Sequence, residues 1–414
     1  TQVDLEVDQI ALAAPTGRAK ARMAESMKGA LHKLTDFTAD PKIAKDMTLN
    51  HTTDNAYTLH SLLYKQLQGS PEKLNYKLIV VDEFSMVDVS LFSLLIQSMK
   101  PDCRLILLGD MHQLPPVGQG SVLGNMSQSF TQTKASLSED YLLRFRDLFS
   151  EVPMDHDQHG YELVSHRPHR LLNKMVVLTK THRSEGDILK LAQGVNDSDI
   201  ASVRSVLKQT EWTALPLHWP GRETSMVYVP PQISSARDVA HFYLKHHLSS
   251  TWKSTLGLIQ DEYWNTGLEM NRITPSKEGK LYEQLCVAFE PHVSMRILCL
   301  SHHGMSGTQE MNQLARGVLQ PNLKSTDRRI HGELVMLTRN QNDLELYNGD
   351  SGMVFVFRHQ SYVIFPCEGS YRVEPIERLH SLQSAFAISV HKSQGSEYTS
   401  ILLVLPEYKS QLLT

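Results

Sequence analysis

The sequence has few of the features that would place a protein outside the cell or in a membrane. Its 414 residues include four cysteines, and none of them forms a C-x-x-C pair, which argues against a disulfide framework and against a zinc site. No run of about 18 apolar residues occurs, so no membrane-spanning helix is expected. The first residues are acidic and lack an apolar signal core. We therefore expect a cytoplasmic protein with no membrane partner.

The sequence also lacks the phosphate-binding pattern G-x-x-x-x-G-K-[ST]. Its Gly279-Lys280 pair is followed by Leu281, and Thr274 stands where the first glycine of the pattern would be. A net charge of -4 provides no overall basic field, so any binding of nucleic acid must come from local grooves.

A strand-length apolar run that ends in two adjacent carboxylates is the most informative segment. Residues 78–86 read LIVVDEFSM, so Asp82 and Glu83 follow four apolar residues. This arrangement is typical of nucleotide hydrolases, in which the first carboxylate holds Mg²⁺ through water and the second is the general base that polarises the attacking water. The segment predicts hydrolysis of a nucleoside triphosphate, with ATP and Mg²⁺ as cofactors. The alternative for the pair is a strand end that acids merely cap.

Apolar strands alternate with amphipathic helices along much of the chain. This order predicts an α/β protein with parallel sheets covered on both faces, whose ligand sites lie beyond the C-terminal ends of the strands. Asp82, Glu83 and Asp110 fall at such ends. The expected strands are 9–13, 78–81, 104–108, 175–178, 296–300, 385–390 and 401–405, and the clearest helices are 59–67, 89–99 and 309–318.

Two segments depart from the alternation. Residues 127–170 are polar and rich in histidine and are expected to form a surface insertion, since the irregular histidine spacing favours a solvated loop over a metal site. Residues 331–380 contain short strands separated by turn residues, which indicates a small, SH3-like β-barrel insertion. The stretch 200–295 is the least informative.

Six segments, in this order, resemble motifs of superfamily 1 helicases, and more narrowly of their RecD branch, the alpha subunit of exodeoxyribonuclease V. The match spans nearly the whole chain. The segments are AAPTGRAK at 13–20, TLH at 58–60, VVDEFSMVD at 80–88, LGDMHQLP at 108–115, GQGSVL at 118–123 and VHKSQGSE at 390–397.

The resemblance accounts for the absent phosphate loop. In the family a Gly-Lys-Thr loop precedes the first of these segments, and a Thr-Arg segment follows the last. We therefore expect an internal piece of a longer subunit, inactive as an ATPase by itself. The resemblance implies two RecA-like domains, at 1–170 and 171–414, each incomplete at one end.

The resemblance also implies roles for further residues. Gln113 corresponds to the sensor of the γ-phosphate, although a solvated loop glutamine is the alternative. Arg183 is positioned in sequence to act as an arginine finger across a cleft, with a surface arginine as the alternative. Gly109, Asp110, Gly395 and Glu397 are expected near the nucleotide, although Glu397 could be a solvated loop acid.

The expected single-strand track holds phosphates and bases without reading sequence. For its two histidines a packed or capping role is the alternative, and Arg18 and Arg22 are interpreted as a solvated helix face. The residues expected on the track are Pro15, Thr16, Thr58, His60, His391, Lys392 and Ser393.

The predicted function is ATP-driven translocation on single-stranded DNA, in which two RecA-like domains close and reopen in turn. The resemblance implies 5′ to 3′ movement, RecB-like and RecC-like partners, and a role in double-strand-end processing and recombinational repair. No separate nuclease constellation stands out. Two alternatives stay open, a stand-alone RecD-like helicase and a DNA-binding scaffold that does not hydrolyse ATP.

Overall fold

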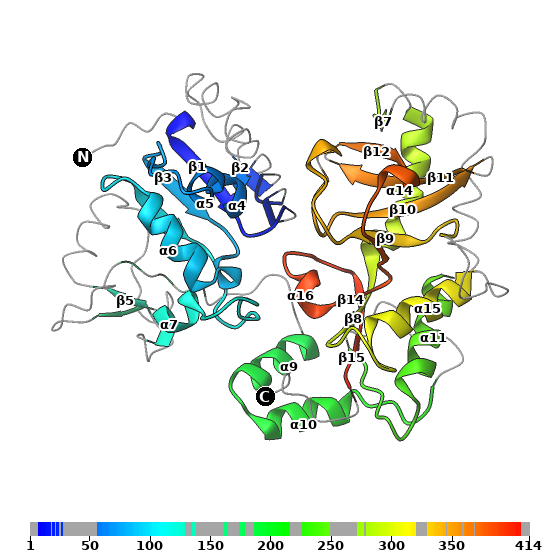
Figure 1. Cartoon of the computed structure of the whole chain (residues 1–414). Coiled ribbons are helices and arrows are strands. Elements are labelled where there is room, and N and C mark those ends of the chain that lie inside the picture. Colours follow the sequence, from blue (N-terminus) through cyan, green and yellow to red (C-terminus); the bar gives the residue numbers. More distant parts are fainter. Residues whose placement is uncertain are drawn as a thin grey trace, which may run out of the picture. The chain divides into compact units, whose positions relative to one another are not determined.

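The elements of the chain are those of a computed structural model and are labelled in Figure 1. The chain divides into two compact units. One comprises 1–84, 93–108 and 207–414, and the other comprises 85–92 and 109–206; each is described by itself. The predicted division into domains at residue 170 stays a prediction. The described residues are 7–17, 19–20, 22–24, 26–27, 56–128, 135–137, 161–163, 174, 176, 178, 186–215, 226–248, 271–276, 279–319, 329–344, 346–357, 360–367 and 369–406.

A four-stranded parallel sheet forms the N-terminal part of the first unit. Its order is β2-β1-β3-β4, and every neighbouring pair is parallel. The side chains of residues 11–14 in β1 and of Ile79 and Val81 in β3 are fully or almost fully buried, and the other residues of the two strands are partly buried, as expected for central strands of a parallel sheet. Three of these strands match predicted runs. The bounds are β1 Ile10–Ala14, β2 Ala56–Thr58, β3 Leu78–Val81 and β4 Arg104–Leu107.

Helices follow these strands at the predicted places. The expected helix over 59–67 is divided in two at Leu63, which ends one short helix and caps the next. A short 3-10 turn follows β3. The next helix begins three residues after this turn ends, and it contains the buried Leu95. Their bounds are α4 Leu59–Leu62, α5 Tyr64–Leu67, η2 Phe84–Met86 and α6 Val89–Ser98.

Strand β4 is an edge strand of this sheet within the part of the chain that the structure describes. Its Ile106 is 45% exposed and the following Leu108 is 47% exposed. A parallel strand with apolar residues is normally covered on both faces and paired on both sides. Strand β4 therefore has the apolar composition of an interior strand, although it lies at the edge of the described sheet.

The second unit contains helices and a small parallel pair of strands. The histidine-rich segment 155–169 lies outside the described residues, apart from the three residues of β6. The expected strand at 175–178 is represented only by Val176 and Leu178, which are exposed and in irregular backbone. The elements are α7 Val122–Gln128, β5 Ala135–Leu137, β6 Tyr161–Leu163, α9 Gly186–Asn196 and α10 Ile200–Gln209; the last four residues of α10, from Val206, lie at and beyond the boundary with the first unit.

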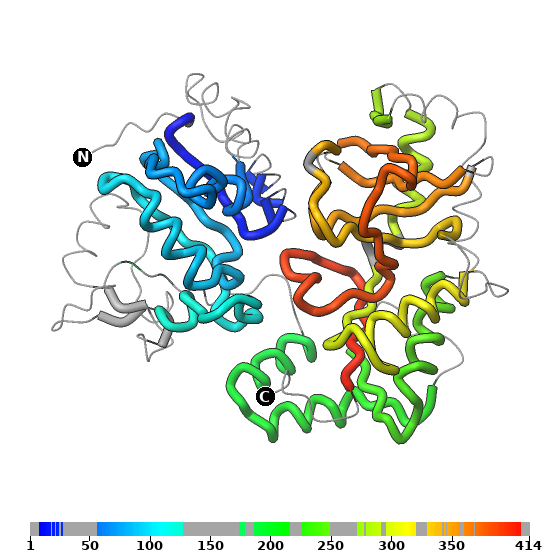
Figure 2. Tube along the Cα trace, viewed as in Figure 1, coloured from blue at the N-terminus to red at the C-terminus, as the bar shows by residue number. Residues whose placement is uncertain are grey.

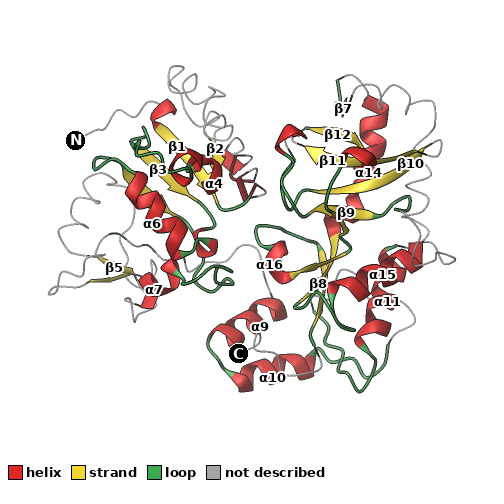
Figure 3. Cartoon of the chain, viewed as in Figure 1, coloured by secondary structure: helices red, strands yellow, loops and turns green. Residues whose placement is uncertain are grey.

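A three-stranded parallel sheet lies in the C-terminal part of the first unit, in the order β14-β8-β15. Strand β8 thus lies between two strands that follow it by about 90 residues or more in the sequence, as the colours of Figure 2 show. Helices α11 and α15 pack together beside it (Figure 3), and Tyr243, Met311 and Phe386 meet in the core. The bounds are α11 Ala236–His247, α14 Gly279–Ser294, β8 Met295–Cys299, α15 Thr308–Leu319, β14 Ala387–Ser389, α16 Val390–Ser393 and β15 Ser400–Val404.

An antiparallel sheet of six strands occupies the region in which a small barrel was predicted. Its order is β13-β9-β10-β11-β12-β7, and the two end strands are not paired with each other among the described residues. Strands β9, β10 and β11 match the short strands expected here, but the closed, SH3-like barrel is not confirmed. Strands β7 and β13 come from outside the predicted limits 331–380. The bounds are β7 Arg272–Ile273, β9 Leu334–Leu337, β10 Ser351–Phe357, β11 Gln360–Cys367, β12 Ser370–Pro375 and β13 Leu382–Ser384.

Across the described residues, the structure contains no helix that is both long and apolar enough to span a membrane.

Candidate functional site

The two predicted carboxylates lie at the C-terminal end of β3, in the middle of the four-stranded sheet. The amide of Asp82 donates to the carbonyl oxygen of Ala13 at 2.9 Å, so it extends the pairing of β3 with β1. Asp82 Oδ1 accepts a hydrogen bond from the amide of Glu83 at 2.8 Å. The sheet thus fixes both residues at the strand end, where parallel α/β folds bind ligands.

Glu83 has a left-handed backbone, with φ of 51°. This conformation costs a residue with a side chain about 1 kcal/mol or more, and it persists only where the surrounding structure enforces it. Here the next amide, that of Phe84, donates to the carbonyl of Leu108 on the neighbouring strand at 2.8 Å. The turn therefore redirects the chain immediately after the carboxylates and leaves Glu83 partly exposed.

Asp82 fits the expected role of a Mg²⁺ partner through water. One of its carboxylate oxygens accepts the Glu83 amide, and the other has no hydrogen-bond partner among the described residues. A single carboxylate with a free oxygen suits Mg²⁺, because this ion commonly keeps several water ligands and takes only one or two protein carboxylates.

The first predicted DNA segment follows β1, the strand beside β3. The hydroxyl of Thr16 accepts the amide of Ala19 at 3.2 Å, and the Thr16 carbonyl accepts the amide of Lys20 at 3.0 Å. Thr16 therefore acts as an N-cap of the helical residues that follow. Pro15 and Thr16 are partly exposed at this turn, so the capping role leaves the prediction of DNA contact open.

The second predicted DNA segment contains another capping threonine. Thr58 ends β2, and its hydroxyl accepts the amide of Ser61 at 3.1 Å, which caps α4. His60 is exposed on that helix. The packed-histidine alternative is therefore wrong for His60.

The predicted segment 390–397 begins with one turn of helix, α16. Ser393 closes the turn by donating its hydroxyl hydrogen to the carbonyl of Val390 at 2.7 Å, and His391 is partly exposed. Partial burial lowers the pKa of the Lys392 ammonium group. Gly395 then adopts φ of 69° and turns the chain away from the helix.

Gly395 and Glu397 lie close to the carboxylate end of the first sheet, within the same unit. A Cβ atom on Gly395 would be 3.7 Å from Glu83 Oε1 and 3.9 Å from the Cβ of Ala19. The Arg22 guanidinium donates to the Gly395 carbonyl at 2.8 Å and lies 2.5 Å from a carboxylate oxygen of Glu397. Glu397 is thus an exposed acid that pairs with Arg22, and its place near the nucleotide stays a prediction.

Arg22 is the site-adjacent residue that sequence reasoning missed. We expected a solvated helix face, but its guanidinium is bonded to two residues that lie more than 370 positions further along the chain. Its only sequence signal is a position five residues after the AAPTG segment, which does not identify such a distant partner.

Three other predicted residues belong to the second unit. Gly109, Asp110 and Gln113 are exposed in the turn after β4. Asp110 Oδ1 accepts the amide of His112 at 2.9 Å, and the Asp110 carbonyl accepts the amide of Gln113 at 3.3 Å. The proximity of Gln113 to the carboxylates stays a prediction. Arg183 lies outside the described residues, so its role as an arginine finger also stays a prediction.

Parallel sheets with a carboxylate pair at a strand end define a class of α/β nucleotide-binding proteins. In agreement, residues 1–119 match the family model described as AAA domain. Along its whole length the chain is similar to RecD. The RecBCD enzyme subunit RecD of Haemophilus influenzae is 28% identical over 423 residues, with 98% of this chain and 58% of that protein covered. The expected resemblance to RecD is confirmed.

Two further relatives extend the comparison. The RecD subunit of Mycobacterium tuberculosis is 26% identical, with 98% of this chain and 57% of that protein covered. The protein named ATP-dependent RecD2 DNA helicase of Deinococcus radiodurans is 23% identical, with 98% of this chain and 40% of that protein covered. The chain therefore spans less than three fifths of the length of these relatives.

A solved structure of Bacteroides Pif1 bound to ssDNA matches with a TM-score of 0.37 and 13% identity, covering 97% of this chain and 86% of that one. A TM-score below 0.5 does not establish a common arrangement.

Proposed function

We propose that this chain is the motor region of a RecD-type DNA helicase subunit, which hydrolyses ATP and moves along single-stranded DNA. The observation that most supports this proposal is the position of Asp82 and Glu83 at the end of a central parallel strand. Backbone hydrogen bonds to β1 and to the residue after β4 fix the chain on either side of the pair. The similarity to RecD over 98% of the chain supports the same proposal.

In this proposal Glu83 is the general base. Its carboxylate, at the strand end, accepts a proton from the water that attacks the γ-phosphate, and Asp82 would hold Mg²⁺ through water. The ion would supply charge stabilisation for the phosphate oxygens. Gln113 senses the γ-phosphate and Arg183 stabilises the transition-state charge. Gly109, Asp110, Gly395 and Glu397 line the nucleotide site.

The phosphate-binding loop is proposed to come from another strand, paired with the open edge of β4. The half-exposed Ile106 and Leu108 are suited to such pairing, because parallel strands are buried on both sides. A strand in this place would end beside Asp82 and Glu83, at the C-terminal edge of the sheet.

The DNA track is proposed to include the turns after β1, β2 and β14. Its members are exposed or partly exposed, and they offer hydroxyl, imidazole and ammonium groups that bind phosphates without reading sequence. They are Pro15, Thr16, Thr58, His60, His391, Lys392 and Ser393. We further propose 5′ to 3′ movement, a cytoplasmic location, RecB-like and RecC-like partners, and a role in double-strand-end processing.

The test is DNA-stimulated ATP hydrolysis by the full-length protein. Glu83→Gln should abolish turnover while ATP binding persists, because the substitution keeps the shape of the side chain and removes its basicity. Glu72→Gln, in the exposed Lys65–Glu72 pair, is the matched control and should hydrolyse ATP as the unmodified protein does. Turnover that survives Glu83→Gln contradicts the general-base assignment, and an unmodified protein that hydrolyses no ATP favours the scaffold alternative.

A stand-alone helicase is the second candidate, favoured by the similarity to the RecD2 DNA helicase. It has the same motor and no RecB-like or RecC-like partners. Affinity purification of the full-length protein from its own cells separates the two: recovery of two stoichiometric large subunits supports the RecD-type assembly, and an active monomer supports the stand-alone enzyme.

A further inference from the structure

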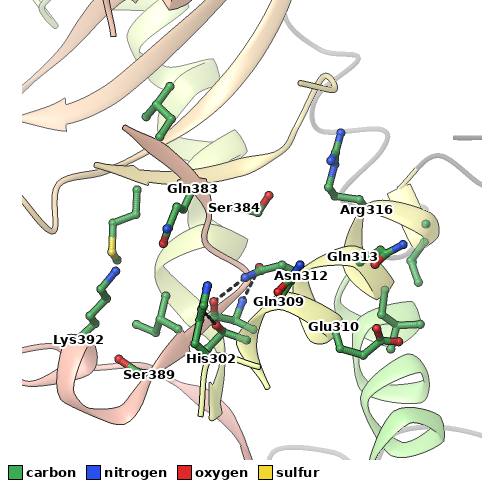
Figure 4. Close-up of a pocket in the computed structure, with 18 of the residues that line it drawn as sticks. His302, Gln309, Glu310, Asn312, Gln313, Arg316, Gln383, Ser384, Ser389 and Lys392 are labelled. Atoms are coloured by element: carbon green, nitrogen blue, oxygen red, sulfur yellow. Dashed lines mark hydrogen bonds between the residues drawn. The ribbon is translucent and has the colours of Figure 1, made fainter. Parts of the chain in front are cut away.

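A cavity of about 1150 Å³ lies beside α15 in the C-terminal part of the first unit (Figure 4). Helix α15 forms one wall, and β13, β14 and the start of α16 form the other. It opens next to the predicted DNA turn, because Ser389 and Lys392 belong to its lining. The lining residues that matter for its chemistry are Gln313, Arg316, Arg329, Gln383, Ser389 and Lys392.

A buried carboxylate holds two of the lining arginines in place. Glu333 is fully buried, and its Oε1 lies 2.7 Å from Nη1 of Arg329 and 3.6 Å from Nε of Arg316. The hydroxyl of Ser384 donates to the same oxygen, and the amide of Ile330 donates to the other at 3.2 Å. One carboxylate thus orients two guanidinium groups, which leaves a positive charge in excess at this end of the cavity.

The other cationic group of the cavity wall is not neutralised by an acid. Lys392 forms no ion pair with a described residue, whereas Arg237 at the rim is paired with Glu310. The cavity therefore contains four cationic side chains against the two carboxylates of Glu310 and Glu333. Such a surplus in a partly enclosed space attracts anions.

The remaining lining is suited to phosphate esters rather than to bases. The amide groups of Gln309, Gln313 and Gln383 can donate to phosphate oxygens. No phenylalanine, tyrosine or tryptophan lines the cavity among the described residues, so it lacks the platforms on which bases stack. The chemistry selects a polyanionic backbone without regard to sequence.

We propose that this cavity binds the phosphodiester backbone of single-stranded DNA, as an extension of the turn at 391–393 onto α15. The inference rests on the proposed function, because it assigns a further subsite to the same ligand. Phosphates of the strand lie between Lys392 and the two arginines that Glu333 orients, and the glutamines of α15 and β13 hydrogen-bond the phosphate oxygens.

The test measures binding of a fluorescein-labelled oligo(dT) to the full-length protein by fluorescence anisotropy, in about 50 mM salt. Gln313→Glu and Gln383→Glu each place a negative charge on one wall at an exposed position, which should leave folding intact. Each should weaken binding about 5- to 10-fold, and the loss should shrink as salt rises. The matched control is Gln97→Glu, at an exposed position of α6 outside the cavity. Its affinity for the oligonucleotide should stay within about twofold of that of the unmodified protein.

The outcomes separate this inference from the proposed function. If both cavity variants bind DNA as the unmodified protein does, while His60→Ala, on the proposed track and outside the cavity lining, weakens binding, the cavity assignment is overturned and the function stands. If the unmodified protein binds no single-stranded DNA, both fall. A second arm titrates a fluorescent ATP analogue and inorganic phosphate: if the cavity variants weaken these ligands and leave oligo(dT) unaffected, the cavity is a nucleotide or phosphate site, and the strand assignment is wrong.

Discussion

Arg329 and the fully buried Glu333 form an ion pair of 2.7 Å, and the same guanidinium donates to the carbonyl of Leu382 at 2.6 Å. Arg329 therefore joins the segment just before β9 to β13, the last strand of the six-stranded antiparallel sheet along the chain. The orientation of this sheet on α15 depends on a charged cluster as well as on apolar packing.

We expect Glu333→Gln to lower the free energy of unfolding by about 3 kcal/mol or more, because two partly buried arginines lose their shared counter-charge. Urea denaturation followed by circular dichroism measures the change. Glu72→Gln, which removes one partner of an exposed pair, is the control and should change the free energy by less than about 0.5 kcal/mol. Equal effects of the two substitutions would show that the cluster does not stabilise the fold.

We expect Gly317→Ala to stabilise the protein by about 0.5–1 kcal/mol. Gly317 is in α15, and a Cβ atom there meets nothing within 4 Å, so alanine adds helix propensity without a clash. The control is Gly307→Ala, just before the same helix, where the Cβ would lie 2.6 Å from the carbonyl oxygen of His303. That variant should lower the melting temperature. A lower melting temperature for Gly317→Ala would contradict the prediction.

The strained backbone of Glu83 predicts a conflict between stability and activity. Glu83→Gly relieves a φ of 51° and should raise the stability by up to about 1 kcal/mol while it ends ATP turnover. Thermal unfolding and ATPase assays of the full-length protein test the two effects together. Ser381→Gly, at φ of 61° and outside the carboxylate site, should stabilise similarly and retain activity.

Stability should fall as the pH is lowered from about 6.5 to about 4. Burial, with a smaller contribution from the neighbouring His246, lowers the pKa of His247 to about 4, so the unfolded chain binds a proton in this range that the folded chain does not. Urea midpoints measured across the range test this. His247→Gln should flatten the profile, whereas His241→Gln, at an exposed position of the same helix, should leave it unchanged.

The open edge of β4 predicts that the effect of a substitution at Ile106 on stability depends on the length of the chain. In the 414-residue chain Ile106→Thr should be almost neutral, because Ile106 is 45% exposed. In the full-length protein the same change should cost about 1–2 kcal/mol if another strand covers this edge. An equal small effect in both would contradict the proposed position of the phosphate-loop strand. Phe84→Ala, at a fully buried position, should destabilise both.

The elements predicted best are those that a short run of neighbouring residues indicates by itself. Continuous apolar runs such as 78–81 and 296–300 correspond to β3 and β8 within one or two residues, because a buried parallel strand must be apolar on both faces. The carboxylate pair at the end of β3 was predictable for the same reason. Its position requires only that the strand ends at Val81.

Features that depend on distant pairing were not predictable in the same way. Short alternating strands occur both in barrels and in open sheets, and the difference here lies in β7 and β13, which pair at the two ends of the sheet. The contact of Arg22 with Gly395 and Glu397 likewise joins segments whose separation in sequence carries no local signal. The roles of Gln113 and Arg183 stay predictions, since they depend on the placement of other segments.

The composition of β4 has a consequence for handling the protein. Among the described residues no strand pairs with the outer side of β4, and Ile106 and the following Leu108 are exposed; such an edge is a template for edge-to-edge association. The 414-residue chain should therefore self-associate as its concentration rises, and a lysine at position 106 should keep it monodisperse.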